Sequence, residues 1–228
     1  MSAKPKPERT SLSRELILRA ALDIVDSDQV RELTMSRLGK ALGADPSAVY
    51  RHFRNKDELL LAMADAMLEE VATSFTSVPE PIDNLRHMGW ALRAGYLRRP
   101  GLAQEVAARF TGGATEAKLV LAMIESIEAL GFTRDDAIRR TRAFAEMTLG
   151  HIVMTADVLS LTSAQQAFDL QMATTYYSAP YNPVTVLPRD EQLAATRADS
   201  DAVFHTMVET FLVGLAAERS PVRRTRKS

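Results

Sequence analysis

A short run of polar and basic side chains after Asp45 is the part of this sequence best suited to binding another molecule. Pro46 can open a helix, because its missing N–H loses no hydrogen bond there, and the Asp45 side chain can cap it. Val49 and Phe53 are four residues apart, so they share one face and are expected to pack inward. The outer side and its edges then carry five other residues, Ser47, Ala48, Tyr50, Arg51 and His52.

Such a helix has the side chains needed to read the major groove of DNA, which is about 12 Å wide. Arg51 can pair with O6 and N7 of guanine, and Ala48 can touch a thymine methyl group. Nearby residues can meet phosphates, and Lys56 starts a helix where free backbone N–H groups favour an anion. The predicted DNA-binding residues are Ser36, Arg37, Ser47, Ala48, Tyr50, Arg51, His52 and Lys56, with Lys40 as a further phosphate contact. The alternative is a purely structural helix pair with a solvated surface.

The elements that position these residues are marked by caps. Thr34 caps a helix over residues 35–42, and Gly43 lies where a left-handed C-terminal cap is needed. Only three residues, 43–45, separate this helix from the next, which we expect to run to about Phe53. Asn55 and Glu58 form a capping box for a fourth helix, and Ser13 caps the first. Two short helices joined by a three-residue turn indicate a helix-turn-helix.

The remaining chain also reads as helix, because apolar residues recur every three to four positions and sustained alternation is absent. We predict an all-α fold: a three-helix DNA-binding head and a larger helical bundle. Further helices are expected up to Pro100, over 102–110, up to Gly131, from Thr133 to Leu159, and over 163–177. Three prolines mark an irregular stretch after residue 177, and the last helix is expected to begin near Ser200.

The larger bundle has side chains that suit a small-molecule site. Apolar pockets with a few polar groups hold most such ligands, and His151 interrupts an apolar stripe. The candidate ligand-binding residues are Trp90, Tyr96, Phe110, Met123, Phe144, Met147, His151 and Met154. Each of them is also explained as ordinary core. His205 and Glu209 have the spacing of a metal-binding pair but lack further ligands, so we predict no metal and no cofactor.

Composition narrows the function classes. The chain of 228 residues has no cysteine, which excludes a disulfide framework, a thiolate zinc site and a cysteine nucleophile. The basic start has no apolar core typical of a signal peptide, and no apolar run approaches the roughly 20 residues that span a bilayer. We therefore expect a cytoplasmic protein without membrane contact. The absence of a nucleophile elbow or phosphate-binding glycine loop disfavours an enzyme. Besides a DNA-binding regulator and an enzyme, the third hypothesis is a helical carrier of hydrophobic molecules with a vestigial head.

Residues 33–60, LTMSRLGKALGADPSAVYRHFRNKDELL, closely resemble the DNA-binding head of the tetracycline-repressor (TetR) family. The resemblance covers residues 13–60 and implies that Tyr50 and Lys56 contact the DNA backbone. It also implies that Ser47, Ala48 and Arg51 lie nearest the bases. The sequence departs from the family pattern at Gln29, where Gly is common, and at Gly39, where Ala is common. A glycine inside a helix costs about 0.5–1 kcal/mol relative to Ala.

Two further segments, LRRPGLA over residues 97–103 and FLVGLA over 211–216, resemble the family's C-terminal regulatory domain. The resemblance implies a homodimer, formed by the long helix from about Thr133 and the last helix from about Ser200. It implies a repressor that binds double-stranded, palindromic operator DNA. An apolar or aromatic small molecule would release the repressor from this DNA. The expected domains are residues 1–60, with a basic arm over 1–12, and residues 61–228, with a basic tail over 219–228.

Overall fold

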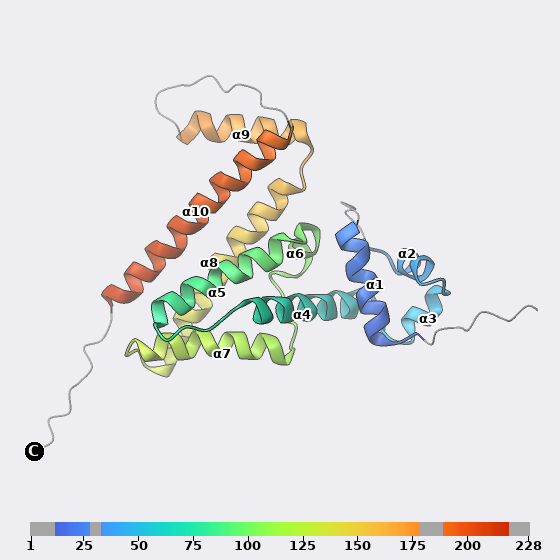
Figure 1. Cartoon of the computed structure of the whole chain (residues 1–228), viewed down its shortest axis with the longest axis horizontal. Coiled ribbons are helices and arrows are strands. Elements are labelled where there is room, and N and C mark those ends of the chain that lie inside the picture. The colour runs from blue at the N-terminus through green and yellow to red at the C-terminus, as the bar shows by residue number, and fades with distance from the viewer. Residues whose placement is uncertain (1–11, 28–32, 178–188, 219–228) are drawn as a thin grey trace, which may run out of the picture. The chain divides into compact units, whose positions relative to one another are not determined.

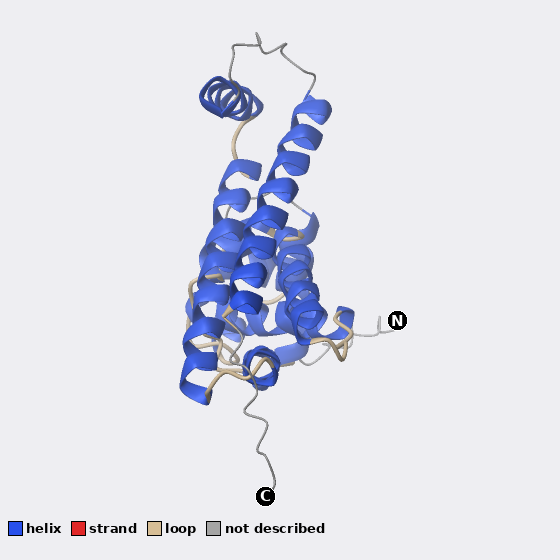
Figure 2. Ribbon diagram, turned by 90° about the vertical axis from the view of Figure 1, so that its left-hand side faces the viewer, coloured by secondary structure: helices blue, strands red, loops and turns tan. Residues whose placement is uncertain are grey.

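The computed structural model of the chain describes residues 12–27, 33–177 and 189–218. In these ranges the chain forms ten α-helices and no strand (Figure 2), which confirms the all-α prediction. Gln29, the basic tail and all of the basic arm except Leu12 lie outside the described residues. Across the described ranges, no helix combines the length and the apolar character that crossing a membrane requires.

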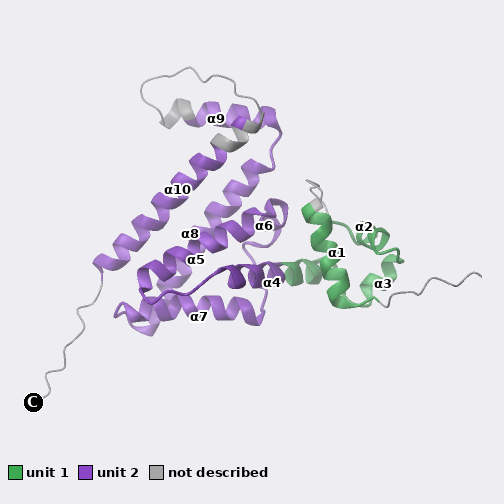
Figure 3. Cartoon of the chain, viewed as in Figure 1, with its two compact units in different colours: residues 1–63 green, residues 64–228 purple. Residues whose placement is uncertain are grey.

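The chain divides into two compact units, residues 1–63 and 64–228 (Figure 3). Unit 1 contains α1 (Arg14–Ser27), α2 (Met35–Ala41), α3 (Pro46–Tyr50) and the first residues of α4 (Lys56–Ser74). Its core is apolar and closed, because the side chains that the helical periodicity places inward are buried. They are Ile17, Ala21, Leu38, Val49, Phe53 and Leu59.

Unit 2 holds the rest of α4 and six further helices. These are α5 (Pro81–Leu97), α6 (Pro100–Val106), α7 (Ala114–Ala129), α8 (Arg134–Leu159), α9 (Ser163–Tyr177) and α10 (Arg189–Ala217). The long helix α8 packs against α5, α6, α7 and α10, and it runs beside α10 in both views (Figures 1 and 2). Its buried face follows the helical period: Ala137, Thr141, Phe144, Thr148, Ile152 and Thr155.

Three helices, α3, α6 and α10, have boundaries that differ from the sequence prediction. The helix α3 ends at Tyr50 rather than near Phe53, and α6 spans Pro100–Val106 rather than 102–110, because Pro100 takes the first position of α6. The helix α10 begins at Arg189 rather than near Ser200. Residues 190–199 are mostly polar or small residues compatible with a helix. Because few of these residues are large and apolar, a search for apolar periodicity does not detect this part of the helix.

Candidate nucleic-acid interface

The turn between α2 and α3 is held by the predicted caps. The Thr34 hydroxyl accepts a hydrogen bond from the Arg37 N–H at 3.2 Å, and Asp45 Oδ1 accepts one from the Ser47 N–H at 2.8 Å. Gly43 has a φ of 60°, the left-handed conformation expected of it. The hydrogen bonds from Ser47 hold the pKa of the Asp45 carboxyl below its usual range, so the cap is charged at neutral pH.

Gly39 allows α2 to approach the start of α3 closely. A Cβ at this position would lie 3.0 Å from the Ala44 carbonyl oxygen and 3.2 Å from the Pro46 nitrogen. These distances are shorter than most Cβ contacts, and both neighbours are backbone atoms. The glycine that sequence analysis treated only as a helix-weakening residue therefore has a packing role in the helix-turn-helix.

Seven of the eight predicted DNA-binding residues are at least partly exposed. Tyr50 is 48% exposed, and Ser36, Ser47 and Arg51 are also exposed, whereas Arg37, His52 and Lys56 are partly exposed. Ala48 is only 8% exposed, so its predicted place on the outer side of α3 is wrong. In a helix of five residues, Ala48 and its neighbour Val49 both face inward, and the outer surface belongs to Ser47, Tyr50 and Arg51.

An interaction that sequence analysis missed joins α1 to the end of this region. Arg14 Nη1 donates to the His52 carbonyl oxygen at 2.8 Å and to Glu58 Oε1 at 2.9 Å. The Arg14 guanidinium also lies over the buried ring of Phe53. These contacts fix the loop after α3 to α1. No local pattern indicates them, because Arg14 is 38 residues from His52 and 44 from Glu58.

Glu58 completes this network, but it forms only one of the two hydrogen bonds of the predicted capping box. The Glu58 N–H donates to Asn55 Oδ1 at 2.8 Å, as predicted, but Glu58 Oε2 accepts from the Arg54 N–H at 2.9 Å rather than from Asn55. The Arg54 N–H, and next the Arg14 side chain, lower the pKa of Glu58. The carboxylate therefore bridges α1 and the loop before α4.

The candidate ligand-binding residues in unit 2 do not form a single cluster. Tyr96, Met123 and Phe144 are buried, and Trp90, Met147 and His151 are partly buried. Phe110 is 84% exposed and Met154 is 70% exposed, so within one chain neither lines an enclosed site, and their prediction as lining residues is wrong. Phe110 lies in the loop after α6, and Met154 is off the buried face of α8.

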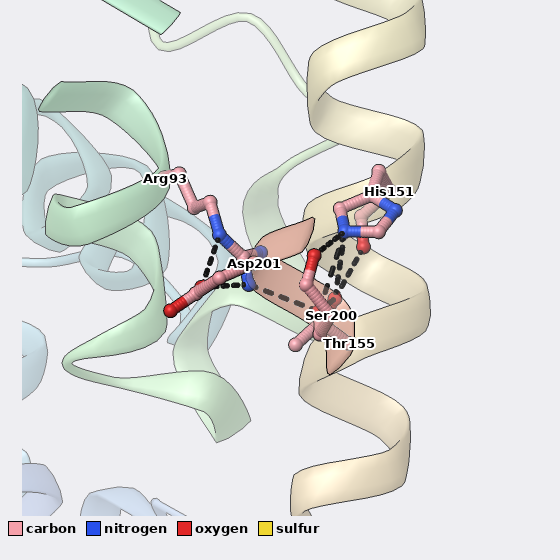
Figure 4. A network of polar contacts seen from close by, with 5 residues as sticks. All are labelled: Arg93, His151, Thr155, Ser200 and Asp201. Atoms are coloured by element: carbon pink, nitrogen blue, oxygen red, sulfur yellow. Dashed lines mark hydrogen bonds and ion pairs between the residues drawn. The ribbon is translucent and has the colours of Figure 1, made fainter. Parts of the chain in front are cut away.

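His151 instead belongs to a polar cluster formed by α5, α8 and α10 (Figure 4). Its Nε2 lies 3.2 Å from the Ser200 carbonyl oxygen, and Thr155 Oγ1 lies 2.8 Å from Ser200 Oγ. Because a carbonyl oxygen can only accept, Nε2 carries the proton in this contact. Burial, and secondly the charge of Arg93, lower the pKa of His151.

Arg93 is the residue of this cluster that sequence analysis missed. It is 3% exposed, whereas arginine is rarely buried. Its Nη2 donates to Asp201 Oδ1 at 2.7 Å and to Ser200 Oγ at 2.9 Å, and its Nε donates to Asp201 Oδ1 at 3.1 Å. Arg93 and Asp201 are 108 residues apart, so the sequence shows only an ordinary surface charge.

The matches to family models agree with this architecture. Residues 17–63 match the model of bacterial regulatory proteins of the tetR family, and residues 80–219 match the tetracyclin repressor-like C-terminal domain. The chain belongs to the TetR family. It is a DNA-binding transcriptional regulator, which confirms the resemblance seen in residues 33–60.

Individual TetR-family proteins align with nearly the whole chain. The class A tetracycline repressor protein from transposon 1721 of Escherichia coli is 30% identical, over 94% of this chain and 95% of its own. A possible TetR-family transcriptional regulator from Streptomyces coelicolor has 25% identity and a TM-score of 0.71, over 91% of this chain and all of its own. BioQ, solved with its double-stranded DNA operator, has the same fold, with a TM-score of 0.64 at 24% identity over 91% of this chain and 99% of its own.

Within the described parts of this TetR-family chain, no group of three or more His, Asp or Glu side chains is arranged to hold a metal ion. Glu209, half of the metal-like pair in the sequence, is bound to Arg86 instead: Arg86 Nε donates to Oε1 at 2.5 Å and Nη2 donates to Oε2 at 2.9 Å. The Arg86 side chain lowers the pKa of Glu209. This pair links α5 to α10 and is structural.

Proposed function

We propose that this TetR-family regulator is a repressor that binds a near-palindromic operator as a homodimer and is released by a small molecule. The observation that carries the proposal is the exposed side of α3, where Ser47, Tyr50 and Arg51 project from a capped turn. Such a side enters the major groove in helix-turn-helix proteins. The class A relative is named a repressor, and BioQ was solved with its operator.

Each exposed residue has a separate role in the proposed complex. Arg51 reads a guanine, and Ser47 lies at a base edge near the start of α3. Tyr50 and Lys56 bind the DNA backbone, and Ser36 and Arg37 bind phosphates. Such contacts fix the position of the protein on the duplex but do not read the base sequence. Ala48 supports α3 from within. His52 offers its side chain at the edge, while its carbonyl is held by Arg14.

The homodimer is supported by exposed small and apolar residues on α8 and α10. Gly150 and Gly214 lie inside these helices, and a Cβ at either would meet no atom within 4 Å. A glycine there weakens an isolated helix by about 0.5–1 kcal/mol, and close approach of a partner helix gives it a use. The apolar side chains exposed on the same two helices are Ile138, Met154, Val203 and Val213.

Effector release follows from two-state coupling. The effector must have a higher affinity for the conformation that cannot bind the operator than for the conformation that can. Unit 2 supplies the site, in line with the tetracyclin repressor-like domain over residues 80–219. Because the proposed target is bacterial operator DNA, the proposed location of the protein is the cytoplasm.

The operator can be selected from random duplexes and its affinity measured by fluorescence anisotropy at several salt concentrations. We expect an inverted repeat with half-sites about one helical turn apart, or a multiple of it, and affinity that falls steeply as salt rises. The double variant Tyr50→Phe, Arg51→Ala should lose at least about tenfold in affinity, since one base contact is worth about 1–3 kcal/mol and the dimer loses one in each subunit.

The matched control is Arg134→Ala in unit 2, which removes an exposed arginine paired with Glu128. It should keep the affinity of the natural protein. Selection without an inverted repeat, or equal affinity of the double variant and the natural protein, would contradict the proposal.

A further inference from the structure

Arg93 has hydrogen-bonding capacity that the described part of the chain does not use. Its Nε donates to Asp201 and its Nη2 donates to Asp201 and Ser200, but its Nη1 is buried and has no hydrogen-bond partner among the described residues. A guanidinium carries five N–H donors, and two of them are on Nη1. Leaving a buried charged donor unpaired is unfavourable, so this side of the guanidinium is suited to an acceptor from outside the chain.

Arg93 is bordered by aromatic rings on one side and by partly or fully exposed residues on another. Its Cζ lies 5.0 Å from the centre of the Phe204 ring, and Trp90 packs edge-on against the same ring at 4.9 Å. Trp90 is one helical turn before Arg93 on α5, and both it and His151 are only partly buried. Asp201, which is about one turn before Phe204 on α10, is exposed. Aromatic walls with one strong donor are typical of sites for small organic ligands.

The helix α8, which packs against α5, also has a buried polar atom that is unpaired within the described residues. Thr148 Oγ1 is buried without a partner in the described ranges, although other threonines in helices, such as Thr155, donate to the carbonyl four residues before them. Thr148 is one turn before His151 and two turns before Thr155 on one face of α8. Arg93 on α5 and Thr148 on α8 thus leave buried polar atoms unpaired, within the described residues, on two helices that pack together.

We propose that the effector of this regulator is a small aromatic or apolar molecule with an anionic oxygen, such as a carboxylate, that accepts hydrogen bonds from Arg93 Nη1. The inference rests on the proposed effector-released function. Charge-assisted hydrogen bonds from arginine to a carboxylate are the strong ones in proteins. The ring system of the effector packs against the partly exposed Trp90, which lies against the fully buried Phe204. Asp201 keeps its place on the Nε side of the guanidinium.

Trp90 is the single tryptophan of the chain, so its fluorescence reports directly on this site. The probes are benzoate, phenylacetate and cyclohexanecarboxylate, each compared with its own primary amide. We expect at least one acid to bind the natural protein about tenfold or more tightly than its amide. The preference should disappear in Arg93→Gln. It should increase in Asp201→Asn, which leaves Arg93 in place and removes the competing negative charge.

Operator binding without any probe is measured for the same variants. If the natural protein binds no DNA, the proposed function fails; if it binds DNA but prefers no acid over its amide, only the inference fails. An acid preference that persists in folded Arg93→Gln overturns the inference. Should Arg93→Gln fail to fold, Asp201→Asn decides, because asparagine keeps a side-chain oxygen that can accept from Arg93 while it removes the negative charge. Unaltered or weaker acid binding in that variant overturns the inference.

Discussion

The guanidinium of Arg14 lies over the ring of Phe53, with 4.1 Å between its Cζ and the ring centroid. The same guanidinium donates to the His52 carbonyl oxygen and to Glu58. One side chain at the start of α1 therefore holds the loop that follows the proposed recognition helix. The position of α3 depends on this contact as well as on its Asp45 cap.

Replacing Arg14 tests this dependence. Arg14→Ala removes a cation–π contact worth about 0.5–1 kcal/mol at a partly exposed site, together with the hydrogen bond to His52. We expect the free energy of unfolding to fall by about 1 kcal/mol and operator affinity to fall with it. Chemical denaturation and anisotropy measure the two effects. Arg54→Ala, whose side chain is 92% exposed, should change the free energy of unfolding by less than about 0.5 kcal/mol; equal losses in both variants would refute a special role for Arg14.

Gly43 is required for its backbone conformation alone. Its φ is 60°, and a Cβ added there would meet no atom within 4 Å. Gly43→Ala should therefore lower the free energy of unfolding by about 1 kcal/mol through left-handed strain. Gly43→Asn should cost less, because asparagine tolerates this conformation. Thermal denaturation of both variants gives the order, and a loss in Gly43→Asn as large as in Gly43→Ala would show that another cause dominates.

Acid should weaken the fold through His151. Burial and the neighbouring Arg93 charge lower the pKa of folded His151, against the smaller opposing effects of the Ser200 carbonyl and Asp201. An unfolded histidine titrates near pH 6.5, so between the two pKa values the unfolded state binds more protons. The contribution of His151 is complete above about pH 6.5 and is lost as pH falls to the folded pKa. Denaturation midpoints from pH 7.5 down to 5 should fall less steeply in His151→Gln than in His87→Gln, which changes an exposed histidine.

The proposed dimer can be separated from the fold of one chain by two glycines. Leucine at Gly150 or Gly214 has open space within a single chain, so neither variant should unfold it. Both should raise the Kd of the dimer in sedimentation equilibrium, because the added side chain keeps the partner helix away. Gly101→Leu is the control, since Gly101 is equally open but lies on α6. A dimer unaffected by either substitution would place the interface on another surface.

The sequence by itself determined the elements that depend on neighbouring residues. Caps at Thr34 and Asp45 and the left-handed glycine at 43 lie where predicted, because a cap is a contact between residues two or three apart. The period of apolar residues determined the all-α class for the same reason. The motif over residues 33–60 was sufficient for the family.

Only the tertiary structure decided which side chains are enclosed and which remote residues meet. Ala48 faces inward because α3 packs against α2. Phe110 and Met154 remain exposed although their types are apolar. Arg14 and Arg93 read as ordinary charges in the sequence, since their partners lie 38 to 108 residues away. Burial and pairing over such separations depend on how helices pack, which no local pattern of residues encodes.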